Sequence, residues 1–248
     1  MKSFLIIGLL AFSASVARAQ TIPAGTLLPV RLNTSLSSSK CHPGQRITAR
    51  LMQSVPLPDG GAIRAGSKLE GHVVRVDTSA NNGRGEIAFQ FDTLKASGSS
   101  VPLKADLRAM ASFMEINDAR IPDMGADRGT SEAAYTTVQV GGEVVYRGGG
   151  PVMDGSDVVG HPVPDGVLAQ PRPNPEAGCR GVLDGNDRPQ AMWVFASNAC
   201  GAYGMPLLTI TSAGRSNLLG EIVLTARDGE LHVPSGTGML LRVVRSGA

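Results

Sequence analysis

The sequence predicts an all-β protein, an antiparallel barrel or sandwich that carries a long Gly/Pro-rich insertion. Three observations lead to this prediction: runs in which apolar and polar residues alternate, turn dipeptides between those runs, and a five-residue pattern that recurs near both ends of the chain. No run of 11 residues or more has the apolar spacing of an amphipathic helix. The nearest candidate, residues 108–117, fits a strand equally well.

The clearest alternation lies in residues 86–94, where Ile87, Phe89 and Phe91 would face one way and the polar residues the other. Residues 101–109 repeat the pattern. A period of two predicts antiparallel strands with one buried face. The Asp-Gly and Asn-Gly pairs that favour tight hairpin turns begin at positions 59, 82, 154, 165, 184 and 228.

The recurring pattern is Ile-Pro-Ala-Gly-Thr at residues 22–26 and Val-Pro-Ser-Gly-Thr at 233–237, with a weaker copy at 63–67. Pro fixes one backbone angle and Gly relieves crowding, so each copy is interpreted as a turn that leads into a strand. A repeated ligand loop is the functional alternative. The pattern favours a first and a last strand that share one sheet.

Residues 117–190 differ from the rest, because Gly and Pro make up 21 of these 74 residues. A strand pair turning at Gly141-Gly142 is expected within residues 135–147, and residues 162–175 are expected to form a surface loop. The chain is therefore divided into residues 1–19, a signal peptide; 20–116, the first part of a β domain; 117–190, a loop-rich insertion; and 191–248, the closing strands.

Residues 1–19 have the three parts of a cleavable signal peptide: a basic start, an apolar core and a small-x-small site. Cleavage is expected between Ala19 and Gln20, and the protein is expected to be periplasmic or secreted. A membrane anchor is the alternative, but a spanning helix needs about 20 apolar residues and this run is shorter. Without Lys2 and Arg18, 21 basic residues face 21 acidic ones, so net charge steers the protein toward neither nucleic acid nor an anionic membrane.

Three cysteines are present, and an odd count in an exported protein predicts one pair and one thiol left over. Cys179 and Cys200 share a segment and are the expected disulfide. Cys41 would then be free, buried or used between chains. Three reduced thiols are the alternative, which an oxidising compartment disfavours.

No catalytic, cofactor-binding or metal-binding residue is predicted. The four histidines, at positions 42, 72, 161 and 232, have no zinc-site spacing, and there is no GxSxG motif. Residues 37–40 fit SxxK, but the partner motifs of that chemistry are absent. The aspartates near glycines are interpreted as turn residues. A binding surface is expected near Trp193 and Tyr203, beside the cysteine pair.

Residues 21–105 resemble the C-terminal β domain of the TrbI-like family, the channel subunits of type IV secretion and conjugation systems. The similarity lies in Ala24-Gly25-Thr26, residues 32–38, the strand at 47–55 and GGAIRAGSKLEG at 60–71. It implies a barrel or sandwich with a structural or binding role. Similar β modules also occur in exported bacterial proteins of no known function. The membrane helix and the pore-lining helical hairpin of that family have no counterpart here.

The sequence thus favours an exported, non-enzymatic β-domain protein that binds or scaffolds in the bacterial cell envelope, without a cofactor. Its expected partner is an envelope protein or a cell-wall component, and not nucleic acid. An exported hydrolase with a site assembled from scattered residues is one alternative, which a cleft joining His161 or His232 to two carboxylates would favour. A component related to type IV secretion channels is the other.

Overall fold

The computed structural model describes residues 21–79, 83–96, 98–122, 135–179, 187–211 and 219–245. The predicted signal peptide, its cleavage site at Ala19–Gln20 and the Asn82-Gly83 turn lie wholly or partly outside them. Within the described residues the protein is all-β, as predicted, with a single short helix named α2 (Phe113–Asp118). No helix in these ranges is long and apolar enough to cross a membrane.

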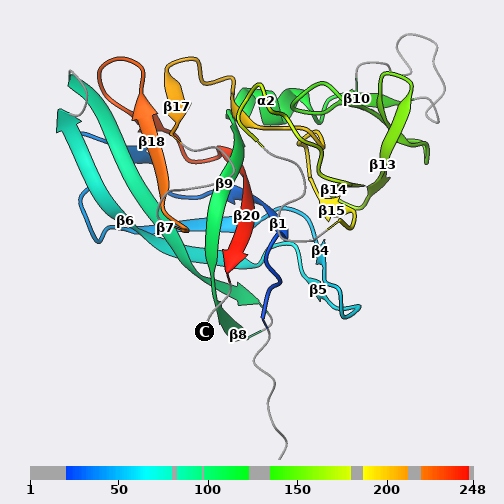
Figure 1. The fold of residues 1–248 in the computed structure, drawn as a ribbon, viewed down its shortest axis with the longest axis horizontal. Helices are drawn as coiled ribbons and strands as arrows, with labels where there is room; N and C mark the ends of the chain where they lie inside the picture. The colour runs from blue at the N-terminus through cyan, green and yellow to red at the C-terminus, as the bar shows by residue number, and fades with distance from the viewer. Residues whose placement is uncertain are drawn as a thin grey trace, which may run out of the picture.

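A ten-stranded sheet forms the larger part of the molecule, in the order β16-β9-β20-β1-β3-β6-β7-β18-β17, with β8 paired to β7. Figure 1 shows this sheet curling so strongly that β9 and β20 lie in front of β6 and β7. Its strands are β1 (Leu27–Leu32), β3 (Arg46–Leu51), β6 (Lys68–Ser79), β7 (Arg84–Ala96), β8 (Ser99–Pro102), β9 (Lys104–Ala111), β16 (Gly201–Tyr203), β17 (Leu208–Ile210), β18 (Ile222–Ala226) and β20 (Gly238–Arg245).

The large sheet is mixed, because β16 runs parallel to β9 while the other pairs are antiparallel. No ladder among the described residues joins its two end strands, β16 and β17. A sandwich-like arrangement therefore fits, and the barrel alternative is not confirmed. Two small ladders flank the sheet: β2 (Leu36–Ser37) with β19 (His232–Val233), and β4 (Val55–Pro56) with β5 (Ala62–Ile63).

The recurring five-residue pattern forms the same turn in all three copies. Gly25, Gly66 and Gly236 have φ angles of 82°, 86° and 92°, a region that favours glycine. Each glycine N–H donates to a carbonyl at or near the end of a strand, that of Val243, Leu51 and Leu32 respectively. The first and last copies thereby join the two ends of the β1–β20 ladder, in which Leu27 lies opposite Arg242. The expected pairing of the first and last strands is confirmed.

Strand β7 confirms the alternation predicted from residues 86–94, since Ile87, Phe89 and Phe91 are fully buried. The half-exposed face expected for residues 101–109 is confirmed as far as Lys104 and is wrong beyond it. In β9 the polar residues Asp106 and Arg108 are buried as well as Ala105 and Leu107, because Arg172 and residues 197–199 contact Arg108 and Gly220 contacts Asp106. The ambiguous segment 108–117 divides: β9 ends at Ala111, and the Ser112 side chain caps α2 by accepting from the Glu115 N–H.

A second sheet of six short strands occupies the segment expected to be a loop-rich insertion, in the order β10-β11-β12-β13-β14-β15. It lies beside the large sheet, at the right of Figure 1. The expected strand pair at 135–147 is confirmed by β10 and β11. The strands are β10 (Thr136–Val138), β11 (Val144–Tyr146), β12 (Val152–Asp154), β13 (Asp157–Val163), β14 (Gly166–Ala169) and β15 (Gln190–Ala191).

The surface loop expected at residues 162–175 is wrong for its first half. Pro162 lies opposite Val167 in the β13–β14 hairpin, and Val167 and Ala169 are fully buried. Although Gly and Pro are abundant, these two small apolar residues pack in a core with Trp193 and Phe195. That second core also contains Leu27 and Leu240 of the large sheet, so the two sheets share a buried interface.

Candidate functional site

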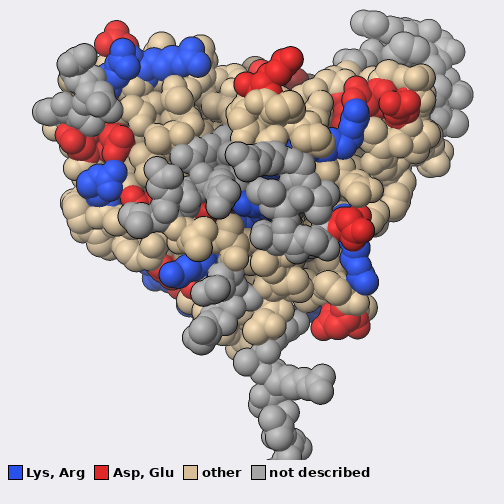
Figure 2. Space-filling view, viewed as in Figure 1, with Lys and Arg blue, Asp and Glu red and all other residues tan. Residues whose placement is uncertain are grey.

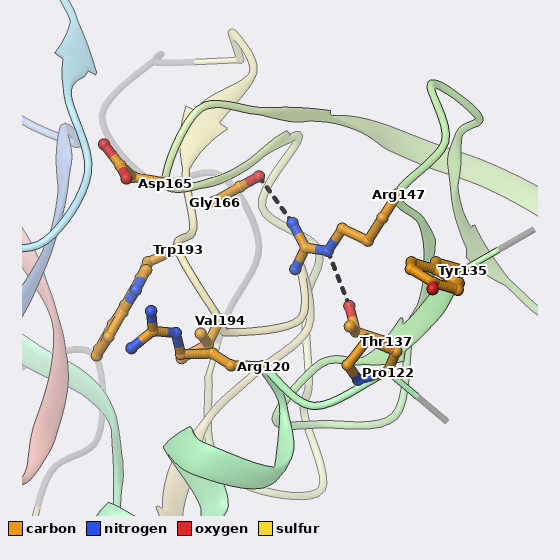
Figure 3. A pocket seen from close by; sticks show the side chains of 9 residues that line it. All are labelled: Arg120, Pro122, Tyr135, Thr137, Arg147, Asp165, Gly166, Trp193 and Val194. Carbon is orange, nitrogen blue, oxygen red and sulfur yellow. Dashed lines mark hydrogen bonds between the residues drawn. The ribbon is translucent and has the colours of Figure 1, made fainter. Parts of the chain in front are cut away.

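A pocket of about 260 Å³ opens between the residues that follow α2 and the small sheet. Its walls combine two cations, two aromatic rings and little negative charge. Figure 3 shows Arg147 reaching into the pocket from one side, with Arg120 and Trp193 on the other. The lining residues are Arg120, Pro122, Tyr135, Thr137, Arg147, Asp165, Gly166, Trp193 and Val194.

The Arg147 side chain is held in place by its neighbours in the small sheet. Its Nε donates to Thr137 Oγ1 at 3.0 Å and its Nη1 to the Gly166 carbonyl at 3.4 Å, which leaves Nη2 for a further acceptor. Burial lowers the pKa of Arg147, and the positive charge of Arg120 lowers it further. Two guanidinium groups are thus placed close enough to repel each other in a partly desolvated site.

Neither guanidinium forms an ion pair with a carboxylate within the described ranges. Asp165 is the one acidic residue that lines the pocket, and it lies exposed at the β13–β14 turn with a φ of 66°. The pocket therefore has unused hydrogen-bond donors and net positive charge. Arginine forks of this kind bind carboxylate and phosphate groups through paired hydrogen bonds.

Trp193 is fixed by a glutamine that reaches across from the large sheet. Gln53, fully buried after β3, accepts from the Trp193 N–H at 2.5 Å and donates to the Val167 carbonyl at 2.8 Å. Gly166 lies so close to Gln53 and Trp193 that a Cβ there would overlap them. The Trp193 ring makes an edge contact with Phe195, with centroids 6.3 Å apart. One wall of the pocket is therefore rigid before any ligand arrives.

The two aromatic residues expected to form a binding surface belong to or pack against the second core, but they have different surroundings. Trp193 is 3% exposed and lines the pocket, so it faces a cavity and not an open surface. Tyr203 is not among the lining residues; it lies in β16, half-buried, and its hydroxyl accepts from the Cys200 N–H at 3.1 Å. Of the expected pair, Trp193 is the one that the structure places at a pocket.

The predicted disulfide is present: Cys179 and Cys200 are bonded, with a separation of 21 residues. Cys41 is a free, half-buried thiol. The bond attaches the chain after the small sheet's β14 to the start of β16. Close by, buried Arg108 donates to the carbonyls of Ala199, Arg172 and Ser197.

Replacing both Cys179 and Cys200 with serine should lower the free energy of unfolding by about 3 kcal/mol, because the bond closes a loop of roughly 20 residues in the unfolded chain. Urea unfolding with and without a reducing agent measures the loss. Cys41→Ser is the matched control and should change little. Equal stability of the double variant and the oxidised protein would contradict the expectation.

No group of three His, Cys, Asp or Glu side chains suited to a metal ion occurs in the described part of the chain. His72 pairs with Asp92 at 2.7 Å, half exposed. His161 lies opposite Leu168 in β13. His232 lines a second, apolar pocket together with one carboxylate, Glu230. None of the three pockets formed by described residues joins His161 or His232 to two carboxylates.

The serine cluster that matched SxxK has a structural environment. Ser37 lies in β2, and its hydroxyl donates to Glu230 at 2.5 Å; Ser39 donates to the same carboxylate. These hydrogen bonds lower the pKa of Glu230. The segment is a strand followed by a turn, so the helix that SxxK chemistry uses is missing here.

Sequence reasoning missed both pocket arginines. Arg120 and Arg147 are isolated basic residues in a chain of balanced charge, and no motif surrounds them. Only the folding of the Gly/Pro-rich segment into a sheet brings them together. In comparisons with known proteins, no family model matches the chain and no curated sequence matches it.

Proposed function

We propose that this chain is an exported, non-enzymatic β-domain protein that binds a small anionic group in the pocket of Arg120, Arg147 and Trp193, as part of a binding or scaffolding role in the bacterial cell envelope. The carrying observation is the pair of guanidinium groups in one partly buried pocket without an ion pair in the described residues. A bound carboxylate or phosphate would offset both the desolvation and the mutual repulsion of these cations.

Three further features support the proposal. The pocket, at about 260 Å³, suits a small ligand or the charged end of a larger one. Its aromatic wall provides apolar contact beside the cations, the combination usual in ligand sites. The disulfide is compatible with a periplasmic or extracellular location. The predicted signal peptide and the similarity to TrbI-like domains remain predictions. No specific observation favours a hydrolase or a secretion-channel component.

The only tryptophan of the chain, Trp193, lines the pocket and provides a built-in reporter. Titration at constant ionic strength with galacturonate and with inorganic phosphate should change its fluorescence in a saturable way, whereas neutral galactose should not. Two anions are used because a carboxylate and a phosphate share the recognised chemistry. The stronger response identifies the source of the anionic group.

Arg120→Gln should weaken that binding about tenfold, the effect of losing one charge-assisted contact worth about 1.4 kcal/mol. This side chain has no hydrogen bond within the described ranges, so the substitution should leave the fold intact. Arg227→Gln, an exposed charge change outside the pocket, is the matched control. Absence of a response to either anion, or equal affinity of the two variants, would refute the proposed site.

A further inference from the structure

Four basic residues form one continuous row across the large sheet. Arg31 of β1 lies opposite Arg50 of β3, Arg50 opposite Lys68 of β6, and Lys68 opposite Lys95 of β7. Neighbouring strands are about 4.8 Å apart, so the row places a cation at each of four successive strand positions. This row is independent of the pocket, since none of its members lines it.

The row lies on the outward face of the sheet. Residues directly opposite one another in a ladder project to the same side, and their sequence neighbours project to the other. Those neighbours, Val30, Leu51, Leu69 and Leu94, belong to the main core. Arg50, Lys68 and Lys95 are exposed and Arg31 is half-buried. All four cations are therefore presented from one rigid surface.

Charge neutralisation along the row is incomplete. Like charges directly opposite each other destabilise a sheet, and here three successive pairs are alike. In the adjoining row, Glu70 takes Lys95, Lys68 and Arg46 as partners, and these contacts lower its pKa to about 2. Glu70 thus pairs with Lys68 and Lys95 of the row, while among the described residues no ion pair joins Arg31 or Arg50 to a carboxylate, so positive charge remains in excess.

The ends of the row carry no acidic residue. Beyond Arg31 the register continues to Gly238 and Ala111, and beyond Lys95 to Ser100. Gly238 lies against the Trp193 ring, where a Cβ would be 3.1 Å from Cζ3. On the face shown in Figure 2, by contrast, acidic and basic side chains are interspersed. A line of four cations is thus a local departure in a chain of balanced charge.

We propose that this row, Arg31, Arg50, Lys68 and Lys95, binds a linear polyanion, specifically an acidic polysaccharide with one carboxylate per sugar ring. A pyranose ring is similar in length to the spacing between strands, so successive carboxylates can meet successive cations. Multiple weak contacts of this kind add along the chain and depend on salt.

The surroundings of the row favour a polysaccharide over other polyanions. Binding to an anionic membrane also uses apolar or aromatic side chains that enter the interface. Among the residues that the structure describes, the exposed large apolar ones belong to none of β1, β3, β6 and β7; they are Phe113, Met114, Ile121, Val138, Tyr146, Val158, Leu207 and Leu219. Single-stranded nucleic acid is bound with aromatic side chains that stack on bases, and the row holds none.

The test measures the affinity of the full mature chain for an oligogalacturonate of about ten residues by calorimetry. The measurement is repeated at several salt concentrations, with neutral dextran as the reference. The double variant Arg50→Gln/Lys68→Gln should weaken binding about tenfold and flatten the salt dependence, because two cation contacts are lost. The matched control Lys40→Gln/Arg227→Gln removes two exposed charges away from the row and should bind like the unaltered protein.

A stability measurement separates a binding role from a structural one. Removing two of four like charges should leave the thermal midpoint unchanged or raise it, since the repulsion across the strands falls. A lower midpoint with unchanged affinity would overturn the proposal. Equal weakening in both double variants would do so too, as would binding to vesicles of anionic lipid with none to the oligogalacturonate. Failure of the Trp193 pocket to bind anions would leave this result untouched.

Discussion

Arg108→Met should lower the free energy of unfolding by about 5 kcal/mol, because roughly 1.5 kcal/mol is lost for each of three carbonyls left without a donor. Nε of Arg108 donates to Ala199 at 2.9 Å, and Nη2 to Arg172 at 2.6 Å and to Ser197 at 3.3 Å. These contacts attach the covering segment to β9. Methionine fills similar space and supplies no donor. Urea unfolding measures the loss.

Arg108→Lys is the companion variant, since it keeps the charge with fewer directed donors. About half of the loss is expected, which keeps the protein measurable if methionine unfolds it. Burial lowers the pKa of Arg108 to about 10, and nearby Arg242 adds to this effect, so the residue stays charged at neutral pH. If the methionine variant proved as stable as the unaltered protein, the three carbonyl contacts would have no energetic importance.

Glu143→Ala should cost about 4 kcal/mol, roughly 2 kcal/mol for each of two buried donors left unpaired. One Glu143 oxygen accepts from the Ser197 N–H at 2.9 Å, and the other accepts from the Ser197 hydroxyl. Both residues are at most 1% exposed. This pair connects the start of β11 in the small sheet to the loop that precedes Cys200 of the disulfide. Ser197→Ala, which removes one of the two donors, should cost less and is the matched comparison.

Glu143 also predicts a pH dependence. Burial raises the pKa of its carboxyl above the usual 4.5, so the folded state holds the proton more tightly than the unfolded chain does. The resulting stabilisation is complete below about pH 4.5 and is lost as the pH rises through the raised value. Glu143→Gln removes this titration. The stability of the glutamine variant relative to the unaltered protein should therefore increase as the pH rises above about 4.5.

Unfolding of both proteins in urea at several pH values measures that difference. A difference that stays constant, or that shrinks as the pH rises, would show that folding does not raise the pKa of Glu143. An exposed acidic residue makes a useful second control, and Asp59, exposed in a turn, is suitable for substitution by asparagine.

The sequence was sufficient for those elements that local chemistry determines. The alternation of Ile87, Phe89 and Phe91 predicted β7, and the Pro-x-Gly-Thr turns predicted that the first and last strands share a sheet. Cys179 and Cys200 were paired correctly from compartment and spacing. Each of these three predictions depends on nearby residues or on a repeated pattern, and none of them requires knowledge of what covers a strand.

The predictions that failed concern contacts between distant parts of the chain. Alternation predicts that Asp106 and Arg108 face solvent, because it cannot reveal that Gly220, Arg172 and residues 197–199 contact the second face of β9. The high Gly and Pro content of the small sheet concealed it in the sequence, although apolar residues such as Val167 and Ala169 are buried in its core. The pocket arginines and the basic row appear only in the folded register, because Arg31, Arg50, Lys68 and Lys95 look scattered in sequence.

The pairing of β1 with β20 has a consequence for how the chain folds. Leu27 and Arg242 are cross-strand partners, so the middle of the large sheet depends on residues at opposite ends of the sequence. During synthesis the edge of β1 that pairs with β20 stays unpaired until β20 has been made. Such long-range pairing makes for slow folding and leaves an open strand edge on which other chains can aggregate in the meantime.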